Sequence, residues 1–181
     1  MWSLIENVFL NDYTVKQRTV GIGVLSKVDA YRLGAVGPMA RASGIAQDMR
    51  QLGYAAYNEL DFEPIVGTAG DCYERSKVRM REIHLSADLL RQVAAKMPAG
   101  EINVPVKGNP DGEVITRVEQ PRGECVYYIK ANGSKNLSRV RIRTPTFANI
   151  PALMQMLPGH ELCDVPVLIL TIDPCISCTE R

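Results

Sequence analysis

The last nine residues of the chain read DPCISCTER and place two cysteines, Cys175 and Cys178, three positions apart. In a turn this spacing directs both sulfurs to the same side, so that two thiolates can bind one ion. Thiolates are soft ligands that favour zinc, iron, nickel or copper over magnesium or calcium. The same pattern also occurs in half-zinc sites and in thioredoxin-like redox pairs, and an exposed tail with incidental cysteines is a further alternative.

Few other side chains of the sequence are candidate metal ligands. The only histidines are His84 and His160, which lack ligand spacing and are expected to be surface or packing residues. Cys72, Cys125 and Cys163 are each solitary, and we expect them to be buried thiols that behave as small apolar side chains. A zinc site with four ligands would therefore be incomplete, because the sequence has no second Cys/His pair.

The composition is that of one globular domain spanning residues 1–181. Apolar residues make up 46% and charged residues 23%, as in soluble globular proteins. The 21 lysines and arginines nearly balance the 20 acidic residues, so no bulk charge favours nucleic acid as a partner. No apolar run approaches the roughly 18 residues of a membrane span, and the first residues lack the layout of a signal peptide. Because five cysteines are an odd number for a secreted disulfide scaffold, we expect a cytoplasmic protein.

The clearest element of the sequence is a long helix over residues 71–97. Asp71 can cap its first turn, Glu74 stands three positions later as in a capping box, and Pro98 marks its end. At 1.5 Å per residue the helix would be about 40 Å long, enough to cross a domain. We expect its many charged residues to face solvent. An apolar stripe along it comprises Ile83, Ala87, Leu90, Ala94 and Met97.

The remaining elements are shorter. Residues 14–28 mix β-branched residues with two glycines and suggest a strand or an extended arm. Apolar residues at helical spacing between Pro38 and Gly53 predict a helix over residues 37–53. Further along, the patterns predict strands at 114–118, 125–131 and 140–143, a helix within 145–157 that Asn149 could cap, and a buried strand or helix at 165–172. The predicted fold class is α+β with helix predominating, a long central helix and a small antiparallel sheet.

Five segments of the sequence together resemble one protein family. They are GPMARASGIAQDMR at 37–50, GDCYER at 70–75, EQPRGE at 119–124, RTPTFANI at 143–150 and the terminal DPCISCTER. In this order they resemble the blocks of the large subunit of NiFe hydrogenases, most closely the membrane-associated, energy-converting group related to formate hydrogenlyase. The resemblance covers nearly the whole chain, and it implies the fold of the C-terminal part of that subunit.

The resemblance implies a nickel–iron centre, NiFe(CN)2CO, as the cofactor. Cys175 matches a terminal nickel ligand, and Cys178 matches a thiolate that bridges nickel and iron. The implied reaction is the heterolytic cleavage or formation of dihydrogen, with Cys175 or Arg122 as the acceptor of the proton. Electrons would pass to an iron–sulfur small subunit, because this chain has too few cysteines to hold clusters of its own. Membrane subunits would hold such a complex on the cytoplasmic face of the membrane.

Four further residues match positions around that centre. Arg122 resembles the arginine that overhangs the metals, where a permanent cation can orient hydrogen bonds in a dry pocket. Asp173 resembles the carboxylate beside it, Pro121 helps to fix the same loop, and Thr146 matches the hydroxyl that donates to a cyanide ligand. Without the resemblance, Arg122 is a residue of a hairpin turn and Asp173 caps the terminal turn.

One motif of the family is missing from the sequence. The family carries a second Cys-x-x-Cys, within Arg-x-Cys-Gly-x-Cys, near the N-terminus of a chain twice this long, and this sequence has none. We therefore expect the C-terminal half of such a subunit, inactive alone, to which a separate N-terminal half would contribute the other ligands. The quinone-site subunit of respiratory complex I, which lacks the nickel cysteines, and a non-catalytic interaction or assembly module are the alternatives.

The end of the sequence suggests how the motif is placed. In the family a peptide beyond the motif is commonly removed after metal insertion, and this sequence stops where the processed product would stop, at Arg181 in place of the usual histidine. Because the apolar residues 165–172 precede the motif, we expect it to point inward, with poorly ordered final residues when metal is absent. Apolar surface that normally contacts the other half would be exposed, so we also expect self-association.

Overall fold

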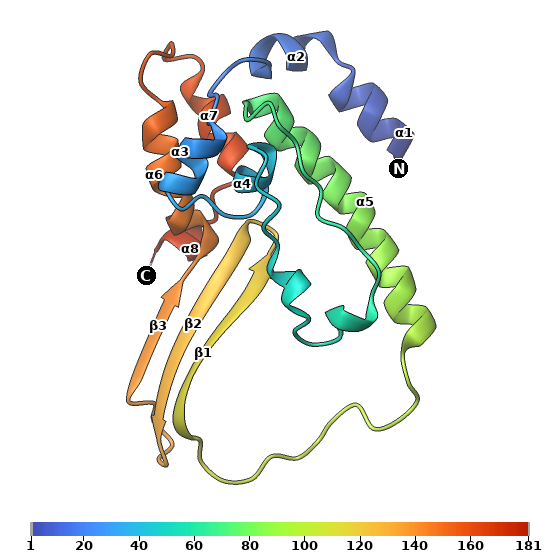
Figure 1. Cartoon of the computed structure of the whole chain (residues 1–181), viewed down its shortest axis with the longest axis vertical. Coiled ribbons are helices and arrows are strands. Elements are labelled where there is room, and N and C mark those ends of the chain that lie inside the picture. The colour runs from blue at the N-terminus through green and yellow to red at the C-terminus, as the bar shows by residue number, and fades with distance from the viewer. Residues whose placement is uncertain (1, 181) are drawn as a thin grey trace.

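The computed structural model describes residues 2–180, apart from the Trp2 side chain, and has an α+β architecture (Figure 1). Its two largest elements are a long helix, α5 (Cys72–Lys96), and a three-stranded sheet. Short helices gather around the first turns of α5 and around one end of the sheet (Figure 1). The predicted fold class, with a long helix and a small antiparallel sheet, is confirmed.

The other elements follow one another along the chain in two groups. Before α5 the chain forms α1 (Trp2–Leu4), the π-helix η1 (Ile5–Leu10), α2 (Tyr13–Thr19), α3 (Lys27–Arg32), α4 (Pro38–Ala42) and the 3-10 helices η2 (Met49–Leu52) and η3 (Tyr57–Glu59). After α5 come β1 (Asp111–Gln120), β2 (Gly123–Asn132), β3 (Arg139–Arg143), α6 (Pro145–Met156), α7 (Val165–Ile172) and α8 (Ile176–Thr179). Between residues 2 and 180, no helix has both the length and the apolar character of a membrane span.

Helix α5 begins as its sequence predicts, because the Asp71 carboxylate accepts a hydrogen bond from the backbone N–H of Glu74 at 2.7 Å. Its burial differs from the expectation. Glu74 and Arg75 are buried, so the prediction that the charged residues all face solvent is wrong for the first turns. There α4 and α7 pack against the helix. The apolar stripe further along carries no such cover, and Ile83 and Leu90 are 47% and 69% exposed.

The sheet has the order β1-β2-β3, and both pairs of strands are antiparallel. All three predicted strands are confirmed, and β1 and β2 extend beyond their predicted bounds. Gln120 pairs with Gly123, which leaves Pro121 and Arg122 as the turn of the hairpin. Gly123 has φ 124°, and a Cβ atom at this position would lie 2.6 Å from the backbone nitrogen of Gly37. The β1–β2 turn therefore packs directly against the start of α4, and this contact fixes where Arg122 lies.

Two predictions for the first third of the chain are wrong in part. Residues 14–28 are not a strand, because Asp12 caps α2 by accepting a hydrogen bond from Val15 N at 2.9 Å. Between α2 and α3 the chain turns at Gly21 and Gly23, which both have positive φ, so the alternative of an extended arm is wrong there too. The helix predicted over residues 37–53 ends at Ala42 as α4, and Gly44, with φ 85°, turns the chain away. A short second helix, η2, then ends at Gly53 in the left-handed conformation, as the sequence predicts.

The hydrophobic core lies where α4, α6, α7 and the start of α5 meet. Of the two alternatives predicted for residues 165–172, strand or helix, the helix is confirmed as α7. It buries Leu168 and Ile172. In α6, Asn149 is not the cap that the sequence suggests. It lies inside the helix, where its side chain accepts from Val36 N at 3.0 Å and donates to Val36 O at 3.3 Å. Thr144 takes the N-cap position instead.

A long connection without helix or strand joins α5 to β1. Residues 97–110 are all exposed, and Figure 1 shows them as a wide loop at the far end of the molecule from the core. The β1–β2 turn, at Pro121 and Arg122, is at the opposite end of the sheet from this loop and faces the group of helices (Figure 1). The sheet thus presents one end to the core and the other to solvent.

Candidate functional site

The DPCISCTER motif leaves the core through a sharp change of backbone direction. Helix α7 ends at Asp173, which has the left-handed conformation, with φ 55° and ψ 62°, and whose N–H donates to Leu170 O. Few residues other than glycine adopt this conformation, although aspartate tolerates it better than most. Cys175 then takes the N-cap position of α8, and Cys178 N donates to Cys175 O at 3.1 Å. The two cysteines therefore lie on one turn, as their spacing predicts.

The two thiols have different surroundings. Cys175 is half-buried, and its Sγ lies 3.1 Å from the Ser177 hydroxyl. The hydrogen bonds from Ser177 and from Cys178 lower the pKa of Cys175 to about 7, whereas burial raises the pKa of Cys178. The thiolate is the form that binds metals and attacks electrophiles, so Cys175 is the more reactive of the pair at neutral pH. Since Cys178 is buried, the predicted inward direction of the motif is confirmed for it. The prediction for Arg181 falls outside the described residues.

Arg122 and Asp173, which lie far apart in the sequence, are in contact. Arg122 Nε donates to the backbone oxygen of Asp173 at 2.7 Å, and Nη2 donates to its carboxylate at 3.1 Å. Both side chains are half-buried. A two-point contact of this kind fixes the plane of the guanidinium, which a single ion pair between flexible side chains does not. The hairpin turn and the end of α7 are thereby held together beside Cys175.

Two hydroxyls at the start of α6 hold the other side of the motif. Thr146 Oγ1 accepts a hydrogen bond from Cys175 N at 3.2 Å, and the Thr144 hydroxyl donates to the backbone oxygen of Cys178. Both threonines are buried. Thr146 thus lies beside the cysteines, where the resemblance places it. Thr144 was missed by the sequence analysis, although it directly precedes Pro145 in the RTPTFANI segment.

Two cavities flank the motif. The smaller has a volume of about 360 Å³ and is lined by Pro174, Cys175, Ile176, Thr179 and Glu180. The larger, of about 660 Å³, reaches from Pro121 and Asp173 to the middle of α5. Pro121 and Asp173 belong to the larger cavity, and Cys175 opens to the smaller. Arg122, Thr146 and Cys178 line neither of the two.

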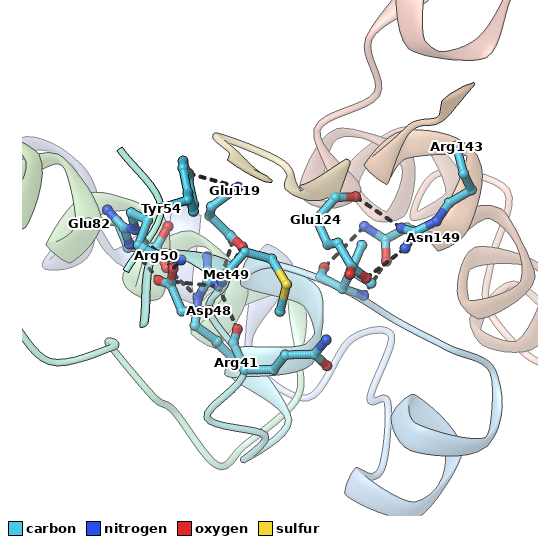
Figure 2. A network of polar contacts seen from close by, with 12 residues as sticks. Arg41, Asp48, Met49, Arg50, Tyr54, Glu82, Glu119, Glu124, Arg143 and Asn149 are labelled. Carbon is cyan, nitrogen blue, oxygen red and sulfur yellow. Dashed lines mark hydrogen bonds and ion pairs between the residues drawn. The ribbon is translucent and has the colours of Figure 1, made fainter. Parts of the chain in front are cut away.

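A buried polar network forms part of the wall of the larger cavity (Figure 2). Arg41, from α4, donates to Glu82 of α5 at 2.7 Å and to Glu119 of β1 at 2.8 Å. Asp48 lies 3.6 Å from Arg41 and accepts two hydrogen bonds from the Arg50 side chain. Burial raises the pKa of Glu119. No local pattern in the sequence indicates this network, because its members are up to 78 residues apart.

The cysteine pair of the motif has no third metal ligand beside it among the described residues. No group of three or more His, Cys, Asp or Glu side chains in residues 2–180 could hold a metal ion. His160 accepts a hydrogen bond from Gly23 N at 3.2 Å and is a packing residue, as expected. Cys72 and Cys125 are buried, but the prediction of a buried thiol is wrong for Cys163, which is exposed in the loop between α6 and α7. Two thiolates fit half of a four-thiolate site for a soft metal.

Comparisons with known proteins place these observations in a family context. The family model of the respiratory-chain NADH dehydrogenase 49 Kd subunit matches residues 1–109 and 104–181. The chain is 45% identical to the carbon monoxide-induced hydrogenase of Rhodospirillum rubrum over 170 residues, which cover 93% of this chain and 47% of that protein. It is 41% identical to the membrane-bound hydrogenase subunit alpha of Pyrococcus furiosus, over 98% of this chain and 46% of the relative.

A third relative carries no hydrogenase name. The chain is 36% identical to a subunit of the NADH-quinone oxidoreductase of Rickettsia prowazekii, over 93% of this chain and 51% of that protein. The chain thus spans about half the length of the curated relatives that it matches.

Proposed function

The chain belongs to the family of the respiratory-chain NADH dehydrogenase 49 Kd subunit, and we propose that it is part of the catalytic subunit of an energy-converting NiFe hydrogenase, the part that carries the C-terminal cysteine pair. Hydrogenases are among the proteins that are similar to it. The names of its relatives are those of a hydrogenase, a hydrogenase subunit and a subunit of an NADH-quinone oxidoreductase. The observation that carries the finer proposal is the pair Cys175 and Cys178 on one turn, beside the Arg122–Asp173 contact. A quinone-reducing subunit has no need of two thiols directed to one point.

In this proposal Cys175 and Cys178 provide two thiolates to a nickel–iron centre, and the part of the subunit that this chain does not cover provides the rest. The donor set fits, because thiolates favour nickel and iron and because Cys175 ionises near neutral pH. The nickel–iron centre, when bound, would catalyse the cleavage of dihydrogen. The chain alone, with half of the ligands, would hold no stoichiometric centre and would be inactive.

The other residues of the site would act on the proton and on the shape of the pocket. Cys175 Sγ, or Arg122, would accept the proton from dihydrogen and release it again. The contact of Arg122 with Asp173 keeps its guanidinium in one orientation. Thr146 Oγ1 accepts a hydrogen bond from Cys175 N and thereby fixes the backbone that carries this thiol. Hydrogen bonds within the chain thus hold these groups in place before any substrate binds.

The partners follow from the same proposal. An iron–sulfur small subunit would accept the electrons, and membrane subunits would hold the complex at the cytoplasmic face of the membrane. The name of the Pyrococcus furiosus relative, a membrane-bound hydrogenase subunit, supports such a peripheral position.

A metal analysis tests the proposal. The chain would be produced together with the uncovered half of the Rhodospirillum rubrum relative, and nickel and iron would be measured in the purified complex along with hydrogen-dependent dye reduction. We expect one nickel and one iron per complex, and the loss of both in Cys175→Ser and Cys178→Ser. The chain produced alone should contain no stoichiometric metal, and robust dye reduction by the chain alone would contradict the proposal.

The similarity to an NADH-quinone oxidoreductase subunit favours a second candidate, a quinone-site subunit without metal. In that case the complex would contain no nickel, and the serine variants would assemble and function like the parent chain. A third alternative, a non-catalytic assembly module, predicts stable docking to partner subunits without nickel and without any effect of the serine variants on turnover of the complex.

A further inference from the structure

Arg79 lies in α5, and its guanidinium is buried without a full set of partners. Nη1 donates to Arg75 O at 3.3 Å, but Nε and Nη2 are buried and have no hydrogen-bond partner within residues 2–180. Burial also lowers the pKa of Arg79 to about 10. Buried polar groups in folded proteins nearly always have partners, so an arginine in this state indicates a missing ligand.

The contrast with Arg75, one turn earlier on the same helix, shows that this fold does satisfy its buried arginines. Arg75 donates from Nη1 to Gly23 O and Gly70 O, and from Nε to Thr171 Oγ1. Arg41 is likewise paired with two glutamates. In Arg79, by contrast, Nε and Nη2 are buried and have no hydrogen-bond partner in the described part of the chain, although the charges of Asp173 and Glu82 act on it from nearby.

The surroundings of Arg79 indicate the chemistry of the missing group. The side chain lines the cavity of about 660 Å³, and α5 continues this wall with Ile83, Ala87 and Leu90. These four residues lie at spacings of three and four, on one face of the helix, over about 17 Å. Ile83 and Leu90 are exposed. One cation followed by a row of apolar side chains over two to three turns matches a polypeptide segment that carries a carboxylate and apolar residues.

We propose that this face of α5 binds the part of the subunit that the chain does not cover, and that a carboxylate of that part pairs with Arg79. The length of the relatives supports this occupant, since the chain spans about half of each of them. The identity of the partner rests on the proposed function. The pair of Arg79 with a carboxylate is a specific contact that the cysteine motif and the similarity to known proteins do not indicate.

The stability of the chain alone provides the first test. Arg79→Met removes two buried guanidinium nitrogens that have no hydrogen-bond partner and keeps the apolar stem, so it should raise the Tm of the chain. The matched variant Arg75→Met removes a satisfied arginine and should lower the Tm. Arg91→Met, at an exposed position further along α5, should leave the Tm within error. A decrease for Arg79→Met like that for Arg75→Met would overturn the proposal, because it would mean that the chain itself stabilises this charge.

Association with the other half provides the second test. The half of the Rhodospirillum rubrum hydrogenase outside the match would be titrated against this chain in calorimetry without nickel or iron. We expect Arg79→Met to weaken binding at least about tenfold and Arg79→Lys to weaken it less, with no effect of Arg91→Met. Equal affinities for the parent chain and Arg79→Met would overturn the proposal, and so would full competition by millimolar acetate, which would assign the site to small anions.

The two proposals can fail separately. Association that depends on Arg79 in a complex that never takes up nickel would contradict the hydrogenase function and support the interface. If the complex took up nickel and iron equally with the parent chain and with Arg79→Met, the result would support the hydrogenase function and contradict the interface.

Discussion

At the scale of single residues, the site combines one thiol that ionises easily with one that does not. In the metal-free chain at pH 7, about half of Cys175 should be thiolate, since its pKa is about 7. We expect iodoacetamide to modify Cys175 and the exposed Cys163 rapidly, and Cys72 and Cys178 slowly. Mass spectrometry of timed samples would give the rate at each site.

Ser177→Ala is the matched variant for this measurement. It removes the hydrogen bond that lowers the pKa of Cys175, so the rate at Cys175 should reach its plateau at higher pH, with no change at Cys163. Rapid modification of both cysteines of the motif, with Cys72 protected, would contradict the buried position of Cys178.

A second residue-scale prediction concerns Asp48. Burial opposes its ionisation, but the hydrogen bonds from Arg50 and the charge of Arg41 outweigh burial and hold its pKa below the ordinary value. A lowered pKa stabilises the fold above the pKa of the unfolded chain, about 4, and this stabilisation is lost as the pH falls below it. Asp48→Asn should therefore lower the free energy of unfolding by about 3 kcal/mol at pH 7, and by less at pH 3.

Urea unfolding at pH 3, 5 and 7 would measure this difference. Asp88→Asn, which affects an exposed pair with Arg91, should change the free energy of unfolding by about 0.5 kcal/mol or less at each pH. A gap between Asp48→Asn and the parent chain that stays constant from pH 3 to pH 7 would mean that this carboxylate does not titrate as its surroundings indicate.

At the scale of elements, the hairpin β1–β2 positions Arg122 through the close approach of Gly123 to Gly37. Gly123→Ala would place a Cβ atom within 2.6–2.8 Å of the Val36 and Gly37 backbone, so the turn would have to shift. We expect a loss of about 3 kcal/mol in the free energy of unfolding, and the release of the Arg122–Asp173 contact. Gly112→Ala, in the same sheet and also at positive φ but in open space, should cost only about 1 kcal/mol.

Chemical denaturation would give both values, and equal losses for the two variants would show that the approach of the turn to α4 does not matter for stability.

Local patterns predicted the elements that depend on neighbouring residues in the chain. The cap of α5 at Asp71 and the three strands of the sheet were predicted from local patterns, and both are confirmed. The strand predicted within residues 14–28 was wrong because it rested on the β-branched side chains there. The residue that decides for a helix, Asp12, lies outside that stretch. Of the site, the resemblance predicted which residues gather around the motif. The Arg41 network and the unsatisfied Arg79 depend on contacts across the fold, and no spacing in the sequence indicates them.

At the scale of the whole molecule, the exposed face of α5 should make the chain associate with itself when no partner covers it. Light scattering at increasing concentration should show an average mass above that of one chain. Leu90→Gln, which replaces one of the most exposed apolar residues of this face, should reduce that mass. Leu162→Gln replaces an even more exposed leucine, which lies in the α6–α7 loop, and should not reduce it. A single-chain mass for the parent at high concentration would contradict this expectation.

The exposed connection of residues 97–110 makes the molecule divisible. Its backbone forms no helix or strand, and all of its side chains are exposed, so proteases should cut here before they cut elsewhere. The fragments on either side should stay together, because Arg41 and Glu82 in the first are bonded to each other and Arg41 is bonded to Glu119 in the second. Fluorescent reporters or affinity tags inserted in this loop would therefore report on assembly without touching the cysteine motif, which lies at the opposite end of the hairpin.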